Sequence, residues 1–406
     1  MDSREPRSPH PEVLEPLRPT PALVTIFAVT LMAVLGVASV APAFPAVARV
    51  FGVGAHEVGY LITAFTLPGV VLSPLLGAWA DRWGRRAVLV PALAVFGVAG
   101  VACAFAPDLQ TLIVLRLVQG IGAAPLGSLN VTLIGDLYHG RRQVSAMGAN
   151  AAVLSVGTAI YPPLGGLLAD LDWRLPFLLP VLAIPVAILA ARTLPDHQRG
   201  EPEHMLRYFG RILRSLGLRR LGLMVGSLLT FLVLYGSYLT YLPFVMDERF
   251  DASSKTIGGV FFVASVATAV VSSRLAPITE RLGRRWLLVI SYGFYGASMA
   301  VVPFLPSLAW MLLPAFLFGV GNGMNIPTLM QWLASSVDRE VRAGVMALNA
   351  VALRGGQTLG PIVAGVGFSL AGVEGAFAVG AAVSVLLVGL ALLLGRGSGT
   401  DAAAAR

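Results

Sequence analysis

Apolar segments of 18 or more residues recur from one end of this 406-residue chain to the other. As a helix, each is long enough to cross the ~30 Å of hydrocarbon in a bilayer. Only 12% of the residues are charged, against about 25% in an ordinary soluble domain. These observations predict an all-α polytopic membrane protein and disfavour the alternative, a soluble enzyme with a very apolar core.

Charged positions and clusters of proline and glycine divide the chain into twelve expected spans. Proline and glycine also occur inside the spans, which membrane bundles tolerate because neighbouring helices satisfy the freed backbone groups. The first six spans are expected at roughly 22–48, 57–80, 87–106, 109–136, 144–169 and 175–194. The second six are expected at roughly 221–245, 256–278, 286–305, 308–335, 343–369 and 375–395.

The basic residues set the expected orientation. Most of the 29 lysine and arginine residues lie on the same side of the spans as both chain termini, which marks the cytoplasmic side of an inner or plasma membrane. Residues 1–21 and 396–406 are then cytoplasmic tails. We expect the first tail to be disordered, because it is polar and rich in proline. It lacks the short apolar segment of a signal peptide. The net charge of +8 follows from this topology and does not indicate nucleic-acid binding.

A shift that places Asp81 on Glu280 aligns the two halves of the sequence over a long stretch without gaps. Asp81-Arg82-x-Gly84-Arg85-Arg86 falls on Glu280-Arg281-x-Gly283-Arg284-Arg285. At the same shift Gly120, Gly122, Asn150, Gly157, Pro162 and Gly166 fall on Gly319, Gly321, Asn349, Gly356, Pro361 and Gly365. We therefore expect two six-helix bundles, 22–194 and 221–395, related by a pseudo-two-fold axis along the membrane normal. Paired repeats of this kind are a transporter architecture with the substrate path between them.

The connection between the bundles, 195–220, contains HMLRYFGRILRSLGLRRL. Its apolar residues repeat at helical spacing while arginines take another face; the two sets are Leu206, Phe209, Leu213 and Leu216, and Arg207, Arg211 and Arg214. We expect an amphipathic helix on the inner membrane surface. A partner-binding helix is the alternative.

Three motifs resemble those of the major facilitator superfamily. GAWADRWGRRAVL, from Gly77, matches the family signature between the second and third spans, and LRLVQGIGAA, from Leu115, resembles the fourth-span motif of proton-linked members. GTAIYPPLGG, from Gly157, resembles the fifth-span exporter motif GxxxGPxxGG, with Tyr161 where the family usually has glycine. The resemblance covers nearly the whole chain.

This resemblance implies a secondary transporter of the 12-helix drug/proton antiporter branch, working by alternating access. It would export a small organic molecule, drug-like or a metabolite, in exchange for protons. Uptake of a small organic solute is the alternative within transport. A non-transporting membrane sensor or scaffold is the alternative outside it.

The resemblance also gives the charged loop a gating role, because in the family this loop locks the two halves together when the cytoplasmic side is closed. Asp81 would face the start of the eleventh span, and Arg82 or Arg85 would pair with Asp136. Gly77 and Gly84 would permit close packing and a tight turn. A purely topological role is the alternative for the arginines. The expected latch residues are Gly77, Asp81, Arg82, Gly84, Arg85, Arg86 and Asp136, with Glu280, Arg281, Gly283 and Arg284 in the second half.

Two arginines lie deep inside spans, where ionisable residues are costly and indicate function. Arg116 lies in the fourth span, with Gln119 and Asn130 continuing along roughly its face. Arg354 lies near the middle of the eleventh span, with Gln357 one turn on. Each arginine requires hydrogen-bond partners or a water-filled cavity, and each could attract an anionic substrate.

Other polar residues lie in the seventh and tenth spans, which with the first and fourth line the cavity in the family. Asn322 and Asn325 are three residues apart on one face, and Tyr235, Tyr238 and Tyr241 repeat at a spacing of three. An interfacial aromatic belt and hydrogen bonds between helices are the alternatives. The candidate substrate or coupling residues are Arg116, Gln119, Asn130, Tyr161, Tyr235, Tyr238, Asn322, Asn325, Arg354 and Gln357.

The fifth span combines glycines and prolines. Gly157, Pro162, Gly165 and Gly166 suggest a kinked helix packed closely on a neighbour. A bend here would bias which side of the protein opens. Ordinary packing of small residues is the alternative, and both can hold.

No Asp, Glu or His lies in the middle of an expected span. Because arginine does not titrate in this role, proton coupling would require Asp81, Asp136 or a charge on the substrate. The sequence has no GxxxxGK[ST] phosphate loop and no cluster of metal ligands, so we expect no enzyme activity and no cofactor. The lone thiol, Cys103, is expected in the core, and the protein is expected to be a monomer in the lipid bilayer.

Overall fold

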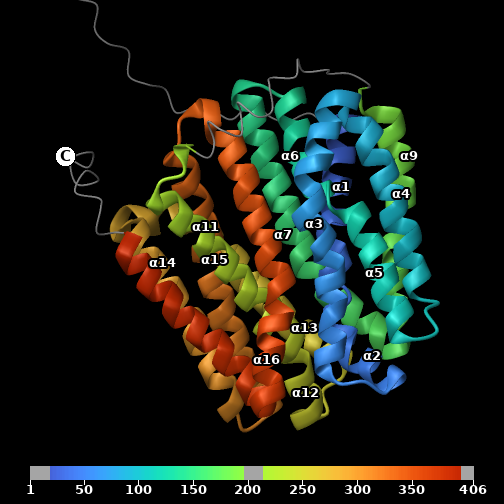
Figure 1. The fold of residues 1–406 in the computed structure, drawn as a ribbon, viewed down its shortest axis with the longest axis vertical. Coiled ribbons are helices and arrows are strands. Elements are labelled where there is room, and N and C mark those ends of the chain that lie inside the picture. The colour runs from blue at the N-terminus through green and yellow to red at the C-terminus, as the bar shows by residue number, and fades with distance from the viewer. Residues whose placement is uncertain (1–18, 196–213, 395–406) are drawn as a thin grey trace, which may run out of the picture.

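The computed structural model describes residues 19–195 and 214–394, and the regular secondary structure within these ranges is helical (Figure 1). Eleven helical segments of this described part are long and apolar enough to cross a membrane. The last of them, Gly344–Leu394, is interrupted at Ala371 and Gly372, whose backbone angles are not helical. Its two parts bring the number of spans to the twelve that the sequence predicted.

The first bundle contains six of these spans. They are formed by α1 (Pro21–Ala38), η1 (Ala41–Ala43), α2 (Phe44–Phe51), α3 (Ala55–Trp83), α4 (Arg85–Cys103), α5 (Leu109–Ala123), α6 (Leu126–Leu137), α7 (Gly140–Leu171), α8 (Leu175–Leu178), η2 (Leu179–Leu182) and α9 (Ala183–Thr193).

The second bundle contains the other six. They are formed by α11 (Leu218–Val233), η3 (Leu234–Tyr241), α12 (Leu242–Phe250), α13 (Ser254–Ser273), α14 (Leu275–Val301), η4 (Val302–Phe304), η5 (Leu308–Met311), α15 (Leu312–Ser335) and α16 (Arg339–Leu394).

Each bundle has six spans, so its chain returns to the side from which it started. We call this side, at the top of Figure 1, the linker face; α1 and α11 begin there, and α9 and α16 end there. We call the opposite side, which carries α2 and α12, the far face (Figure 1). The expected tails and most of the amphipathic connecting helix lie outside the described residues.

Side-chain caps fix several helix starts. Thr20 accepts a hydrogen bond from the backbone nitrogen of Leu23, and Pro21 occupies the first turn of α1. Asp108 caps α5 by accepting from the Thr111 nitrogen at 2.7 Å. Both devices satisfy or remove backbone donors that the first helical turn leaves free.

The charged turn of the second half lies where the sequence places it. The ninth span is expected to begin near residue 286, and α14 is interrupted just before that point by Gly283, a single non-helical residue with φ +72°. Gly84 makes the equivalent turn between α3 and α4 with φ +98°. Since left-handed φ values favour glycine, these two residues account for both tight turns. The ninth span therefore begins directly after Gly283, close to the expected boundary, and residues 275–282 form a short helical segment before the turn.

The internal repeat is visible in individual contacts. Arg85 Nε donates to Asp136 Oδ2 at 3.1 Å, and at the equivalent positions Arg284 Nη1 donates to Ser335 Oγ at 2.8 Å. Likewise Ser73 donates to the carbonyl of Ala124 at 3.0 Å, and Ser272 to that of Gly323 at 3.1 Å. The two six-helix bundles thus share their internal packing as well as their topology.

Many large apolar side chains lie on the outer surface of the bundles. Large side chains such as Val71, Leu171 and Phe304 are 60%, 79% and 82% exposed. On a soluble protein such exposure would favour aggregation. Around a bundle of spanning helices it is the surface that meets lipid.

Candidate substrate site between the two bundles

Helices α3 and α16 form one seam between the bundles. Thr63 Oγ1 donates to the carbonyl of Thr358 at 3.0 Å, and the hydroxyls of Thr66 and Thr358 lie 2.9 Å apart. Towards the far face the helices approach more closely, since a Cβ on Gly365 would lie 2.5 Å from His56 Nδ1. Towards the linker face the seam reaches Gly69, which lies at the midpoint of α3.

Helices α7 and α13 form the second seam, related to the first by the repeat. Ser265 Oγ donates to the carbonyl of Thr158 at 3.1 Å. Nearer the far face, a Cβ on Gly258 would lie 2.9 Å from Pro163 Cα. At the far-face end, the backbone nitrogen of Lys255 donates to Asp170 Oδ1 at 3.2 Å.

The two seams use equivalent positions. Gly59 packs against Pro361 in the first seam and Gly258 against Pro162 in the second. The contacts described in both seams run from the far face to about the middle of the spans. An ion pair between Arg49 and Asp247 adds a further link at the far face itself.

Arg354 lies at the inner end of the first seam. Its Cδ and Nε would lie 3.1 and 3.2 Å from a Cβ on Gly69, so the arginine stem occupies the space that glycine leaves. Its Nη1 donates to Gln357 Oε1 at 3.4 Å, which is a long hydrogen bond. The side chain is partly exposed, and Gln357 is 9% exposed. The sequence prediction of an arginine with Gln357 on its face is confirmed.

Tyr235 lies on η3 of the seventh span, next to Gly236, which packs against Gly360 of α16. It is close enough to Arg354 for an electrostatic interaction, and its ring stacks on Phe231 with centroids 6.0 Å apart. Tyr235 lies near the start of η3, which is a π-helix. The wider turn is seen in the hydrogen bond that Thr240 Oγ1 donates to the carbonyl of Tyr235, five residues earlier, at 2.6 Å.

The π-helical segment changes where the tyrosines point. Tyr238 is 3% exposed and stacks on Phe318 at 3.9 Å, whereas Tyr241 is fully buried and stacks on Phe368 at 5.2 Å. A common face for tyrosines spaced by three holds for an ordinary helix, but not for a π-helix with more residues per turn. The expectation that Tyr238 lies with Tyr235 on a cavity face is therefore wrong in this structure. The aromatic-belt alternative is also wrong for Tyr241, which is buried.

The candidate asparagines form separate hydrogen-bond groups. In the first bundle Asn130 donates to Thr30, which donates to Asn150 Oδ1 at 2.5 Å, so three spans are joined. In the second bundle Asn325 Nδ2 donates to Thr230 at 3.0 Å and is fully buried.

Asn322 differs from Asn325, because it is only half-buried and accepts a hydrogen bond from Tyr295 at 2.7 Å. The helix-joining alternative therefore accounts for Asn130 and Asn325. Of the two asparagines in the tenth span, Asn322 is the one with exposed surface.

Arg116 is fully buried inside the first bundle. Its Nη1 donates to the carbonyl of Gly36 at 2.9 Å and to Gln119 Oε1 at 2.8 Å, and its guanidinium lies 4.3 Å from the Phe65 ring centroid. A further bond reaches the carbonyl of Leu61 at 3.3 Å. The arginine thus joins the first, second and fourth spans. The expectation that it faces a solute is not met in this conformation, because it has no exposed surface.

The fifth span packs closely, as its glycines predicted. A Cβ on Gly157 would lie 3.0 Å from Leu31, while Gly165 and Gly166 lie directly against the backbone of Ser39 and Ser254. Tyr161 is 8% exposed and lies beside Gly157. Helix α7 continues through Pro162 without a non-helical residue.

The charged loop between the second and third spans, residues 77–86, forms only some of the contacts that the sequence predicted. Arg85 bonds both Asp81 and Asp136, whereas Arg82 is exposed. The Asp81 side chain is 64% exposed, and its predicted contact with the start of the eleventh span stays a prediction. Close packing is wrong for Gly77 in this structure, because a Cβ there would meet no atom within 4 Å.

The equivalent turn in the second half is more open to solvent. Glu280, Arg281 and Gly283 are exposed there, and the mirrored latch role stays a prediction. Among the described residues, the loop of the first half therefore has the stronger contacts, because Arg85 pairs there with Asp81 and Asp136.

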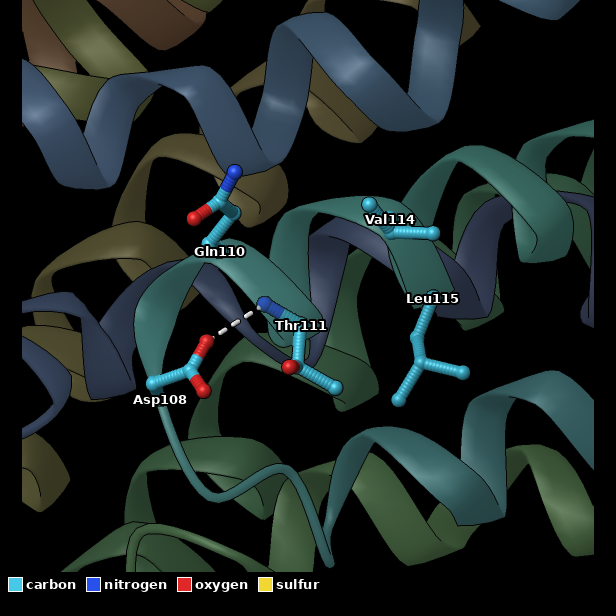
Figure 2. Close-up of a pocket in the computed structure, with 5 residues that line it drawn as sticks. All are labelled: Asp108, Gln110, Thr111, Val114 and Leu115. Atoms are coloured by element: carbon cyan, nitrogen blue, oxygen red, sulfur yellow. Dashed lines mark hydrogen bonds between the residues drawn. The ribbon is translucent and has the colours of Figure 1, made fainter.

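A small pocket at the far-face end of α5 is distinct from the bundle interface (Figure 2). It is lined by Asp108, Gln110, Thr111, Val114 and Leu115. Figure 2 shows Asp108 turned to the Thr111 nitrogen, as a helix cap. Because all five residues come from one helix start, the pocket brings together no groups from different spans, and the seam remains the candidate site.

Sequence reasoning missed several residues of the interface. Thr66, Thr358 and Gly69 are uncharged and carry no motif, and Arg49 and Asp247 belong to none of the motifs either. The available signal was the repeat, which pairs Gly59 with Gly258 and Pro162 with Pro361 at one shift. A glycine that faces a proline at equivalent positions of the repeat indicates that the two corresponding pairs of helices, α3 with α16 and α13 with α7, are in contact.

Known proteins resemble this chain in sequence and in fold. The chain is 24% identical over 366 residues to multidrug resistance protein 2 of Bacillus subtilis (strain 168), covering 85% of this chain and 89% of that protein. It is 25% identical over 338 residues to the bacillibactin exporter of the same organism, covering 78% and 82%. The crystal structure of the nucleoside transporter NupG superposes with a TM-score of 0.74 at 12% identity, covering 92% of this chain and 97% of that one.

The sequence also matches a family of transporters as a whole. The matched regions are residues 26–278 and 224–405, which overlap and together include both bundles. Because the match covers most of the chain, and the twelve spans with their internal repeat agree with it, this protein belongs to the Major Facilitator Superfamily of membrane transporters.

Proposed function

We propose that the chain exports a small organic molecule from the cytoplasm in exchange for protons. The observation that carries this proposal is the similarity, over most of both chains, to multidrug resistance protein 2 and to the bacillibactin exporter. The fifth-span motif GTAIYPPLGG supports the same direction of transport. The similarity to NupG concerns the fold alone.

The two seams supply the moving parts of the proposed cycle. Contacts such as Thr66–Thr358 and Ser265–Thr158 hold the far half of the interface together. They consist of hydroxyl and glycine contacts, which can separate without leaving a buried charge unpaired. Opening the seams at the far face while the linker face closes would move a solute across the membrane.

The linker face is proposed to be cytoplasmic, because most basic residues lie on that side. Proton exchange is assigned to the loop carboxylates Asp81 and Asp136, since no acidic residue lies in the middle of a span. Both carboxylates bond Arg85, so protonation of either would weaken the loop. The remaining latch residues keep their proposed role through the resemblance to the family.

The experiment uses everted membrane vesicles, in which an exporter accumulates its substrate when the membrane is energised. A panel of labelled acidic, neutral and cationic compounds is tested with and without the protein. We expect protein-dependent accumulation of at least one compound, abolished by a protonophore. Movement in the opposite direction would establish uptake, and no movement of any compound would favour a sensor or scaffold.

A further inference from the structure

We infer that Arg354 binds the acidic group of the transported solute, so that the substrate class is an organic anion. The inference rests on the proposed transport function and names the substrate of that same interface. It follows from the charge balance, the set of hydrogen-bond donors and the position of Arg354 in the seam.

Within residues 19–195 and 214–394, no carboxylate pairs with Arg354. All 21 acidic residues of the sequence lie in tails, in loops or near span ends, whereas Arg354 lies near the middle of the eleventh span. Among the described residues, its guanidinium has one hydrogen-bond acceptor, Gln357, at 3.4 Å. A charge at this depth is costly unless a partner or water satisfies it, and it marks substrate pathways in membrane proteins.

Arg116 provides the comparison within the same chain. It is also an arginine inside a span, but it is fully buried and has three oxygen acceptors at 2.8–3.3 Å. Arg354 is partly exposed and has one long bond. Arg116 is held in place by these three acceptors, although its buried Nη2 has no partner among the described residues. Arg354 retains donors on a side chain that a ligand can reach.

Two side chains near Arg354 can donate hydrogen bonds to a ligand. The amide oxygen of Gln357 is taken by Arg354, which leaves its NH2 group to donate. The hydroxyl of Tyr235, within electrostatic range, can donate as well. A set of donors around one guanidinium suits a group rich in acceptors, namely a carboxylate, sulfonate or phosphate, and the planar fork of arginine binds such groups in pairs of hydrogen bonds.

Aromatic rings lie next to these donors. Tyr235 stacks on Phe231, so one side of the site presents an apolar, planar surface. Such a surface suits the body of an amphipathic molecule better than a small inorganic ion. The ligand class is therefore an organic acid with an apolar or aromatic body.

The position of Arg354 fits a transported ligand. It lies where the described contacts of the α3–α16 seam end, packed on Gly69 at the midpoint of α3. Thr66 and Thr358 close the seam on the far side of it. When this seam separates and the linker face closes, the same guanidinium is exposed to the opposite compartment, which is the requirement for a carrier site.

The test measures ligand binding by the shift in unfolding temperature of the detergent-purified full chain. The probes are 2-naphthoate, naphthalene-2-sulfonate and indole-3-acetate, each with its uncharged amide, together with chloride. At least one acid should bind about tenfold or more tightly than its amide, because a charge-assisted pair is lost in the amide. Arg354→Gln should remove this preference, and Arg354→Lys should retain part of it.

Two matched controls separate binding from folding. Arg274→Gln changes an exposed arginine at the end of α13 and should leave the preference unchanged. Gly69→Ala crowds the Arg354 stem and should weaken acid binding severalfold without removing a charge, whereas Gly293→Ala, which meets no atom within 4 Å, should not. If Arg354→Gln does not fold, the Gly69→Ala pair decides the question.

Several results would overturn the inference. Two of them concern the acids and amides: a preference for acids that survives Arg354→Gln, or tighter binding of the amides than of the acids. The other two are a rise in unfolding temperature with chloride alone, and no binding of any acid at millimolar concentration. Because binding is measured in detergent, none of these results depends on the direction or the coupling of transport. Failure of the export proposal would appear in the vesicle assay instead.

Discussion

Arg49 and Asp247 form an ion pair that joins the two bundles at the far face. Arg49 Nη1 lies 2.5 Å from Oδ1 and 2.7 Å from Oδ2 of Asp247. Arg49 follows the first span and Asp247 ends the seventh, so equivalent ends of the two repeats meet. The arginine side chain is 60% exposed, so the pair adds only modestly to the closure provided by the seams.

The first prediction concerns this pair. Arg49→Ala should shift the equilibrium towards the far-face-open state by at most about fivefold, since exposed pairs contribute about 0.2–1 kcal/mol. Spin labels at Val50→Cys and Glu248→Cys, in a Cys103→Ala background free of other thiols, would report the distance between the bundles. The exchanged pair Arg49→Asp with Asp247→Arg should restore the closed population. Equal opening in the exchanged pair would show that the ion pair does not hold the face closed.

The second prediction uses the repeat as its own control. The first bundle has Arg85 bonded to Asp136, with side chains 16% and 26% exposed, where the second has Arg284 bonded to Ser335. Asp136→Ser converts the first arrangement into the second and should lower the free energy of unfolding by about 1 kcal/mol, because an ion pair becomes a hydrogen bond between a charged and a neutral group. Ser335→Asp should not destabilise the protein. Thermal unfolding in detergent measures both, and equal effects would contradict the comparison.

The third prediction separates gating from stability at Asp81. Its side chain is 64% exposed, so Asp81→Asn should change the free energy of unfolding by less than about 0.5 kcal/mol. Transport should fall strongly, because the proposed latch uses this carboxylate when the linker face closes. Vesicle flux and thermal unfolding are measured on the same preparation. Wild-type flux in this variant would remove Asp81 from the gate.

The fourth prediction concerns Arg116, whose sequence context suggested substrate binding. Arg116→Ala should destabilise the first bundle by about 3 kcal/mol or more, because the carbonyls of Gly36 and Leu61 lose a buried donor and the space is left unfilled. The loss should be seen in thermal unfolding without any ligand. A variant of native stability that lost only anion binding would return Arg116 to the substrate site.

The number, order and repeat of the spans could be predicted from the sequence, because membrane thickness and internal symmetry act on every span at once. The shift that aligns Asp81 with Glu280 also aligns Arg85 with Arg284, and the structure gives those residues equivalent contacts. The tight turn at Gly84 could also be predicted from the sequence, because its φ of +98° is one that glycine adopts readily.

The details of the site were harder to predict, because they depend on partners that no pattern encodes. Arg116 and Arg354 look alike in sequence, and only the backbone carbonyls of Gly36 and Leu61 make the first a structural residue. The π-helical segment Leu234–Tyr241 is invisible to hydropathy, since an added residue per turn leaves the composition of the span unchanged. It separates Tyr238 from Tyr235, which residue spacing alone had placed together.

The last prediction tests whether close approach of the bundles is needed for transport. Gly258 and Gly259 are neighbours in α13, but a Cβ on Gly258 would meet the backbone of Pro162 and Pro163, the latter at 2.9 Å, whereas a Cβ on Gly259 would meet no atom within 4 Å. Both alanine substitutions have the same effect on helix propensity. Gly258→Ala should hold the far face open and reduce transport at least severalfold, while Gly259→Ala should transport normally.

The spin-label pair on α2 and α12 reports the state of the far face in both of these variants. A longer distance in Gly258→Ala alone would tie the loss of transport to the α7–α13 seam, because only that glycine lies against α7. If both variants transport equally and keep the short distance, then the bundles do not need this contact to close. The seam would in that case be a consequence of the closed state and would not stabilise it.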